Sequence, residues 1–185
     1  FSLGVTKLIT TGQGGVVVTR DKDIYDRLRS LQDQGDPAKA NEFNGMGFNF
    51  KFTSMMAAIG KAQLARVPER IAHLKAIYAK YEDGLSEFPF IKLIPVNVTH
   101  GEIPLWVEAM SKERDMLRKF LSSKGIDTIG LRPNLSLSPH LRDTGDFPRS
   151  TVFQDQGMGL PCGPTQPLEN VDRVLETLFL YNKQR

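Results

Sequence analysis

Lys7 is the residue of this chain that could most directly do covalent chemistry. It lies within FSLGVTKLITTGQGG, residues 1–15, among apolar and small residues and beside a glycine-rich turn. Burying a lysine ammonium is costly unless the amine loses its proton or forms a covalent bond. Lys7 is therefore a candidate Schiff-base former. On spacing alone the alternative, an exposed lysine at the end of a strand, stays open. The turn is not a phosphate-binding P-loop, because no Gly-Lys-Ser/Thr follows it.

The other reactive side chains form no recognisable constellation. The three histidines, at 73, 100 and 140, are far apart and lack metal-ligand spacing, so we expect no metal site. Among them His140, in the sequence SPHL, is the best candidate to line a substrate cleft. Cys162 has no histidine beside it in the sequence and is expected to be a small buried residue. Trp106 is expected to belong to the core.

The elements of the first third of the chain must position Lys7. The β-branched run from Gly14 to Thr19 predicts a buried strand. Asp21 is expected to cap a helix that ends near Gly35. Residues 36–52 show no periodicity and predict a long ordered loop, and such loops are often functional. Thr53 is expected to cap an Ala- and Met-rich helix.

The rest of the chain has the pattern of a small α+β domain. Pro68 fits the first turn of a long helix, and strands are expected at 91–94, 103–109 and 126–131. Between the last two strands, Ser111 is expected to cap a helix that Gly125 ends. After a Pro-rich loop and a short helical stretch near Thr151, a helix with one apolar stripe closes the chain. This order predicts a mostly antiparallel sheet.

Composition restricts the class of protein further. The 185 residues carry 24 Lys and Arg against 21 Asp and Glu, and 40% of them are hydrophobic. Basic residues alternate with acidic ones, so we expect no nucleic-acid partner. One cysteine excludes a disulfide framework and favours a reducing compartment. No apolar run approaches the roughly 20 residues of a membrane helix. We expect a soluble, cytoplasmic protein.

Several ordered motifs resemble one family. Ser2-Leu3, Thr6-Lys7 and Thr10 to Gly15 resemble the pyridoxal-phosphate lysine segment of the DegT/DnrJ/StrS sugar aminotransferases. The resemblance continues through the whole chain, in the segments Leu31 to Gly35, GFNFKFT (47–53), AAIGKAQL (57–64) and LPCGPTQPLENVDRV (160–174).

This resemblance implies a type I aminotransferase fold, α/β overall, with pyridoxal 5'-phosphate as cofactor. Residues 1–55 would be a remnant of the large cofactor-binding domain, and residues 56–185 an α+β small domain. The reaction would be transfer of an amino group, usually from glutamate, to a keto group of a nucleotide-linked sugar, in a homodimer with active sites at its interface. Such sugars serve the biosynthesis of cell-surface polysaccharides.

The resemblance also implies roles for single residues. Lys7 would form the Schiff base with the cofactor and then move a proton between the substrate carbon and the cofactor's C4′. Ser2 would donate its hydroxyl to the cofactor phosphate. Asn49 would reach the phosphate of the neighbouring subunit's cofactor. Lys51 and His140 are expected to contact the substrate.

The chain also departs from the family pattern. Gln13 stands for a family Glu, Gln34 for a His and Lys51 for an Arg, and lysine lacks the two-pronged contact of arginine. The family aspartate that pairs with the pyridine nitrogen would precede Phe1, so we expect the isolated chain to be inactive.

Two alternatives stay open. One is a dehydratase of ketosugars on the same scaffold, which Lys7 disfavours because such family members carry histidine there. The other is a non-catalytic module for dimerisation or interaction.

Overall fold

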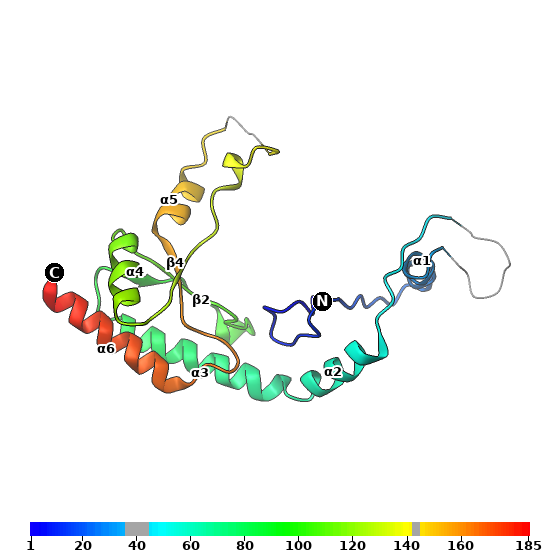
Figure 1. Cartoon of the computed structure of the whole chain (residues 1–185), viewed down its shortest axis with the longest axis horizontal. Coiled ribbons are helices and arrows are strands. Elements are labelled where there is room, and N and C mark those ends of the chain that lie inside the picture. Colours follow the sequence, from blue (N-terminus) through cyan, green and yellow to red (C-terminus); the bar gives the residue numbers. More distant parts are fainter. Residues whose placement is uncertain (36–44, 142–144) are drawn as a thin grey trace. The chain divides into compact units, whose positions relative to one another are not determined.

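The computed structural model describes residues 1–35, 45–141 and 145–185, which form two compact units. Unit 1 spans Phe1–Val67 and unit 2 spans Pro68–Arg185. Figure 1 labels their helices and strands.

The described part of unit 1 contains two helices, α1 (Lys22–Gln32) and α2 (Ser54–Leu64). Both begin where the sequence predicts. The Asp21 carboxylate accepts hydrogen bonds from the N–H groups of Asp23 and Ile24, and the Thr53 side chain accepts one from Met56 N–H. These bonds satisfy N–H groups that have no partner within a helix's first turn.

The strand predicted from Gly14 to Thr19 is wrong. Among the described residues, this segment makes only one isolated bridge, between Ser2 and Gly15. Val16, Val17 and Val18 are 43%, 70% and 70% exposed. A β-branched run becomes a buried strand only when neighbouring strands pair with it and cover it, and unit 1 provides none within its described part.

Unit 2 is a four-stranded antiparallel sheet packed against helices. The strand order is β1-β2-β4-β3, so β2 and β4 are central. The elements, in chain order, are α3 (Val67–Leu85), β1 (Lys92–Leu93), the 3₁₀ turn η1 (Val98–His100), β2 (Val107–Met110), α4 (Arg114–Ser123), β3 (Ile129–Gly130), the 3₁₀ turn η2 (Leu135–Leu137), α5 (Pro148–Gln156), β4 (Gly157–Leu160) and α6 (Leu168–Gln184). The α+β prediction with an antiparallel sheet is confirmed.

The core of unit 2 lies between the sheet and three helices, α3, α4 and α6. On β2, Val107 and Ala109 are buried while the alternate residues are half-buried, as a strand with one covered face requires. The helices contribute fully buried side chains to the same cluster, among them Ile77, Tyr81, Leu117, Leu121, Val171 and Leu178. In Figure 1, α3 and α6 run side by side beneath the sheet. The Lys80 amine and the Asp172 carboxylate join the two helices at 2.7 Å.

Several boundaries differ from prediction. The expected strands at 103–109 and 126–131 shrink to β2 and β3. The expected cap Ser111 lies two residues before the observed cap position, and its hydroxyl accepts a hydrogen bond from Glu113 N–H instead. Trp106, expected in the core, is 46% exposed.

A stretch of chain that we call the arm, described at residues 131–141 and 145–156, leaves and rejoins this sheet. It runs from the end of β3 through η2 and α5 to β4, and in Figure 1 it projects away from the sheet.

Candidate active site

Lys7 lies in a closed loop formed by residues 1–16. The N–H of Leu3 donates to the Gly14 carbonyl at 2.9 Å, and the N–H of Thr11 donates to the Leu3 carbonyl at 3.1 Å. With the bridge between Ser2 and Gly15, these bonds bring the two sides of the loop together. Ser2 and Lys7, which the sequence places in the same site, are therefore both held on this one loop.

The Lys7 side chain is directed to solvent. Its own N–H donates to the Gly4 carbonyl at 3.1 Å, which places it at the end of a tight turn. Within the part of the chain that the structure describes, its amine makes no hydrogen bond or ion pair. The residue is exposed and lies in a turn rather than at a strand end. Its amine is therefore available to a ligand.

The glycine-rich turn that follows Lys7 is stabilised by threonine hydroxyls. Thr10 Oγ1 donates to the Leu3 carbonyl at 3.1 Å and accepts from the N–H of Gly12 at 2.9 Å. The buried Thr11 hydroxyl donates to the Gln13 carbonyl at 2.5 Å. These hydroxyl bonds therefore help to hold the turn in its shape.

Two close approaches connect this turn to the rest of unit 1. Gly14 has φ +116°, and a Cβ added there would lie 2.7 Å from Cε2 of Phe52. A Cβ on Gly60 of α2 would lie 3.2 Å from the Thr11 methyl group. Glycine at 14 is thus required both by its backbone conformation and by the Phe52 ring.

Asn49 lies on an extended segment that pairs with the end of α1. The Phe48 N–H donates to the Leu31 carbonyl at 2.7 Å, and Asp33 and Asn49 form an isolated antiparallel bridge. The rings of Phe48 and Phe50 stack with centroids 4.8 Å apart. Asn49 itself is exposed. Its side-chain amide makes no hydrogen bond within the described ranges, so it too is available.

Lys51 has a partner that sequence reasoning missed. Its amine lies 2.6 Å from the Asp33 carboxylate. Both side chains are largely exposed, so this pair contributes little to stability. A substrate anion would have to compete with Asp33 for Lys51. In the sequence, the only sign of this ion pair was an acidic residue, Asp33, near the end of the predicted helix.

His140 lies in unit 2, on the arm, and is exposed. Lys7 belongs to unit 1, so the two residues lie in different units. Leu141 beside it lines a hollow in the arm, but His140 does not.

Cys162 is half-buried rather than fully buried. Its Sγ accepts a hydrogen bond from Val107 N–H at 3.3 Å. Burial raises the pKa of the Cys162 thiol. A protonated thiol is a poor nucleophile, so this site does not favour cysteine chemistry.

The described ranges contain no cluster of three or more metal-ligating side chains. None of the helices described is both long and apolar enough to cross a membrane.

Comparison with known proteins decides the family. The model of the DegT/DnrJ/EryC1/StrS aminotransferase family matches residues 1–179. The chain belongs to this family. GDP-perosamine synthase of Caulobacter vibrioides is 32% identical over 96% of this chain and 50% of the relative. The dTDP-3-amino-3,4,6-trideoxy-alpha-D-glucose transaminase of Streptomyces venezuelae is 34% identical over 89% of this chain and 46% of the relative.

Solved structures agree with this assignment. DesV of S. venezuelae has a TM-score of 0.89 at 30% identity, covering 98% of this chain and 50% of DesV. An E. coli GDP-4-keto-6-deoxy-D-mannose-3-dehydratase with bound hydrated PLP has a TM-score of 0.84 at 20% identity, covering 96% of this chain and 53% of the other, which shows a shared fold. The type I fold of the aminotransferases is thereby confirmed. The chain spans about half the length of the curated relatives it matches.

Proposed function

We propose that the protein transfers an amino group from an amino acid, glutamate by the resemblance, to a keto group of a nucleotide-linked sugar, with pyridoxal 5'-phosphate as cofactor. The family match and the names of the relatives support this reaction class. The observation that carries the proposal is the unpaired Lys7 amine on a loop that also holds Ser2.

The polar groups of unit 1 fit this cofactor by their chemistry. The phosphate of the cofactor needs hydrogen-bond donors, and its aldehyde needs an amine with which to form a Schiff base. The Ser2 hydroxyl accepts only from Gly4 N–H, at 3.4 Å, among the described residues, so its own proton is free to be donated. The Asn49 amide and the Lys7 amine also lack partners in the same residues. An amine, a hydroxyl and an amide are thus left available.

Each of these residues then has a defined task. Ser2 and Asn49 would hold the phosphate, and Lys7 would hold the cofactor covalently. When bound, the cofactor supplies the electron-accepting ring on which the amino group is carried. Lys7, once released, would move a proton at the substrate carbon, a role that contributes roughly 10²–10⁴-fold in enzymes. The tight turn from Gly4 to Lys7 limits where the amine can reach.

We further propose that the protein acts as a homodimer, with Asn49 serving the partner's cofactor, and that it is cytoplasmic. The single cysteine supports a reducing compartment. Unit 1 exposes large apolar side chains that an interface would bury, among them Phe50, Met55 and Leu64. We also propose the domain division into residues 1–55 and 56–185. In the structure, α2 belongs with unit 1, which ends at Val67.

Borohydride reduction tests the role of Lys7. The full-length protein, loaded with pyridoxal phosphate and reduced, should carry the pyridoxyl group on the peptide that contains Lys7. Lys7→Ala should remove this label, whereas Lys61→Ala, a control in α2, should retain it. A label on Lys61 or Lys75 instead would overturn the proposal.

A further inference from the structure

Unit 2 has a small hollow beside α4 whose described lining is entirely polar. We call it the α4 pocket. It has a volume of about 360 Å³ and is lined by Asp115, Arg118, Lys119 and Ser122 of α4 and by Asp127 and Thr128, which precede β3. Sites for small ligands typically measure about 300–1,000 Å³. Because an unpaired polar wall is costly to cover with an apolar group, this lining favours a small polar ligand.

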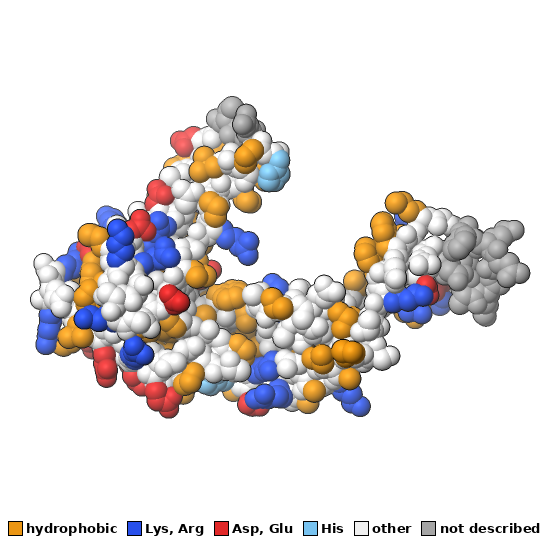
Figure 2. All heavy atoms as spheres, viewed as in Figure 1, with side chains coloured by type: hydrophobic (Ala, Val, Ile, Leu, Met, Phe, Trp, Pro, Cys, Tyr) orange, Lys and Arg blue, Asp and Glu red, His pale blue; other side chains and the backbone are white. Residues whose placement is uncertain are grey.

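The α4 residues line the pocket together because they share one face of the helix. Positions 115, 118, 119 and 122 are spaced i, i+3, i+4 and i+7, which places them in one stripe. Leu117 and Leu121 lie on the opposite face and are buried in the core. Figure 2 shows Lys and Arg side chains over α4 with Asp and Glu side chains among them. The polar face of α4 therefore presents both signs of charge.

Arg118 is held in place but is only partly satisfied. Its Nη2 donates to the Thr128 carbonyl at 3.1 Å, which ties α4 to the segment before β3. A Cβ on Gly130 would lie 3.3 Å from Arg118 Nη1, so glycine leaves room for the guanidinium group. Arg118 Nε is buried and has no hydrogen-bond partner among the described residues, and the side chain makes no ion pair with any of them. A carboxylate bound to this guanidinium would compensate its charge.

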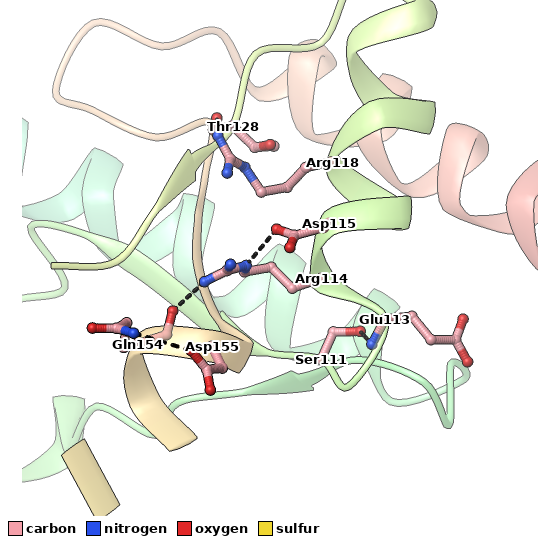
Figure 3. Close-up of polar contacts among 8 residues, drawn as sticks. All are labelled: Ser111, Glu113, Arg114, Asp115, Arg118, Thr128, Gln154 and Asp155. Carbon is pink, nitrogen blue, oxygen red and sulfur yellow. Dashed lines mark hydrogen bonds and ion pairs between the residues drawn. The ribbon is translucent and has the colours of Figure 1, made fainter. Parts of the chain in front are cut away.

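Asp115 already has a cationic partner. Arg114 Nε donates to Asp115 Oδ1 at 2.9 Å, and Arg114 also donates to the carbonyl of Gln154. The hydrogen bond from Arg114 lowers the pKa of the Asp115 carboxyl, and the charges of Arg118 and Lys119 act in the same direction. In Figure 3, Asp115 lies between the guanidinium groups of Arg114 and Arg118. Asp115 is thus ionised, and its charge is largely balanced by Arg114.

Two further charged groups of the pocket are available to a ligand. Lys119 and Asp127 are both exposed, and neither makes a hydrogen bond or an ion pair within residues 1–35, 45–141 and 145–185. Together with Arg118, they give two cations and one carboxylate. The hydroxyl groups of Ser122 and Thr128 add neutral donors and acceptors. The ligand that complements these groups carries two negative charges and one positive charge.

We infer that the α4 pocket binds a free acidic amino acid. Arg118 and Lys119 bind its two carboxylates, and the Asp127 carboxylate accepts hydrogen bonds from its α-ammonium group. An arginine matches a carboxylate through two parallel hydrogen bonds, whereas a lysine binds it as a point charge. This inference goes beyond the proposed function, because no residue of the α4 pocket takes part in the proposed chemistry of Lys7.

Calorimetric titration of the full-length protein with L-aspartate tests this inference. The protein is first loaded with pyridoxal phosphate and reduced with borohydride, so that no aldehyde or imine is left to react with the amino acid. L-Aspartate should bind, and succinate, which has the same two carboxylates but no ammonium group, should bind more weakly. Arg118→Ala should weaken the binding of both probes roughly tenfold to a hundredfold. Asp127→Asn should weaken the binding of L-aspartate several-fold but not that of succinate.

Two further variants serve as controls. Arg149→Ala removes an arginine of unit 2 that does not line the α4 pocket, and it should leave both affinities unchanged. Circular dichroism checks that Arg118→Ala is folded, since Arg118 also ties α4 to Thr128. Lys119→Met changes an exposed side chain that makes no such tie, so it should weaken the binding of both probes even where Arg118→Ala does not fold.

Several outcomes overturn the inference. It fails if L-aspartate does not bind, if succinate binds as tightly as L-aspartate, or if Lys119→Met and Arg118→Ala retain the natural affinity. It also fails if Asp127→Asn weakens both probes by the same factor. Labelling of Lys7 does not depend on these residues. Labelled Lys7 without L-aspartate binding would refute the α4 pocket alone, whereas unlabelled Lys7 with L-aspartate binding would refute the proposed function alone.

Discussion

Gly14 determines the shape of the turn beside Lys7. A side chain at φ +116° costs about 1–2 kcal/mol. The added Cβ would also meet the Phe52 ring at 2.7 Å. We expect Gly14→Ala to lower the free energy of unfolding by about 2–3 kcal/mol, measured by urea denaturation, and to weaken cofactor binding. Gly12→Ala is the matched control, because Gly12 has φ +86° and no atom within 4 Å of an added Cβ. Equal losses in the two variants would show that Phe52 contact does not matter.

Cys162 provides a second test at the scale of a residue, since it is the chain's single cysteine. Burial raises the pKa of its thiol, so less thiolate is present near pH 8 than in the unfolded chain. Iodoacetamide should therefore react several-fold more slowly with the native protein than with protein in urea. The native rate should also rise at a higher pH than the unfolded rate. Coincident pH profiles would contradict the burial of this thiol.

The same shift has a consequence for stability. Because the folded pKa lies above the unfolded one, the folded state holds this proton more tightly. The stabilising contribution of the thiol is fully present below the unfolded pKa. It is lost as the pH rises toward the folded pKa, so the alkaline side is where stability should decline.

Among the elements, α3 and α6 depend on one small residue for their packing. A Cβ on Gly84 of α3 would lie 2.4 Å from Cδ1 and 3.1 Å from Cγ of Leu175 on α6. Alanine favours helix by up to about 1 kcal/mol over glycine, but overpacking costs about 1–3 kcal/mol. We expect Gly84→Ala to lower the unfolding free energy by about 1–2 kcal/mol. In a double-mutant cycle, Gly84→Ala with Leu175→Ala should cost less than the sum of the single changes. Additive losses would show that the two helices can separate freely.

The helices were predictable because their signals are local. Asp21 and Thr53 cap the helices that follow them, as their positions before apolar periodic segments indicated. The strands were predictable only in part. Those expected at 91–94, 103–109 and 126–131 recur, shortened, as β1, β2 and β3, whereas the one from Gly14 to Thr19 is wrong and β4 was not expected, because a strand is defined by its neighbours. β4 has the sequence GMGL, and its two glycines are more typical of a loop than of a strand. Yet a Cβ on Gly159 would lie 2.8 Å from Ile129 of β3, so glycine is there to admit the adjacent strand.

The sequence predicted residues of the candidate site but not the contacts that they make. Lys7 was a candidate from its own surroundings, and Ser2 and Asn49 were found through the resemblance to a family. The structure adds that the Lys7 amine and the Asn49 amide have no partner in the described residues, and that the Ser2 hydroxyl accepts only from Gly4 N–H. The Asp33 partner of Lys51 and the Phe52 contact of Gly14 depend on which distant segments meet. Neither hydrophobic periodicity nor motif spacing predicts which distant segments come into contact.

At the scale of the whole molecule, the proposed shared site would need two copies of the protein. By the resemblance, Asn49 serves the cofactor of the neighbouring subunit, so each site would use Lys7 of one subunit and Asn49 of the other. Unit 1 is consistent with this arrangement, because Asn49 is exposed on a segment held in place by α1. A buried amide that lost its phosphate partner would cost roughly 1–3 kcal/mol.

Mixed dimers test this shared site. Asn49→Ala alone should weaken cofactor binding about tenfold to a hundredfold, and Lys7→Ala alone should abolish amino transfer. When the two variant subunits are mixed, each heterodimer should have one site with both defects and one intact site. Random pairing of a two-fold dimer then restores about one quarter of the natural activity. Size-exclusion chromatography of differently tagged subunits verifies that heterodimers form. If they form and recover no activity, Asn49 acts within its own subunit and the shared site is wrong.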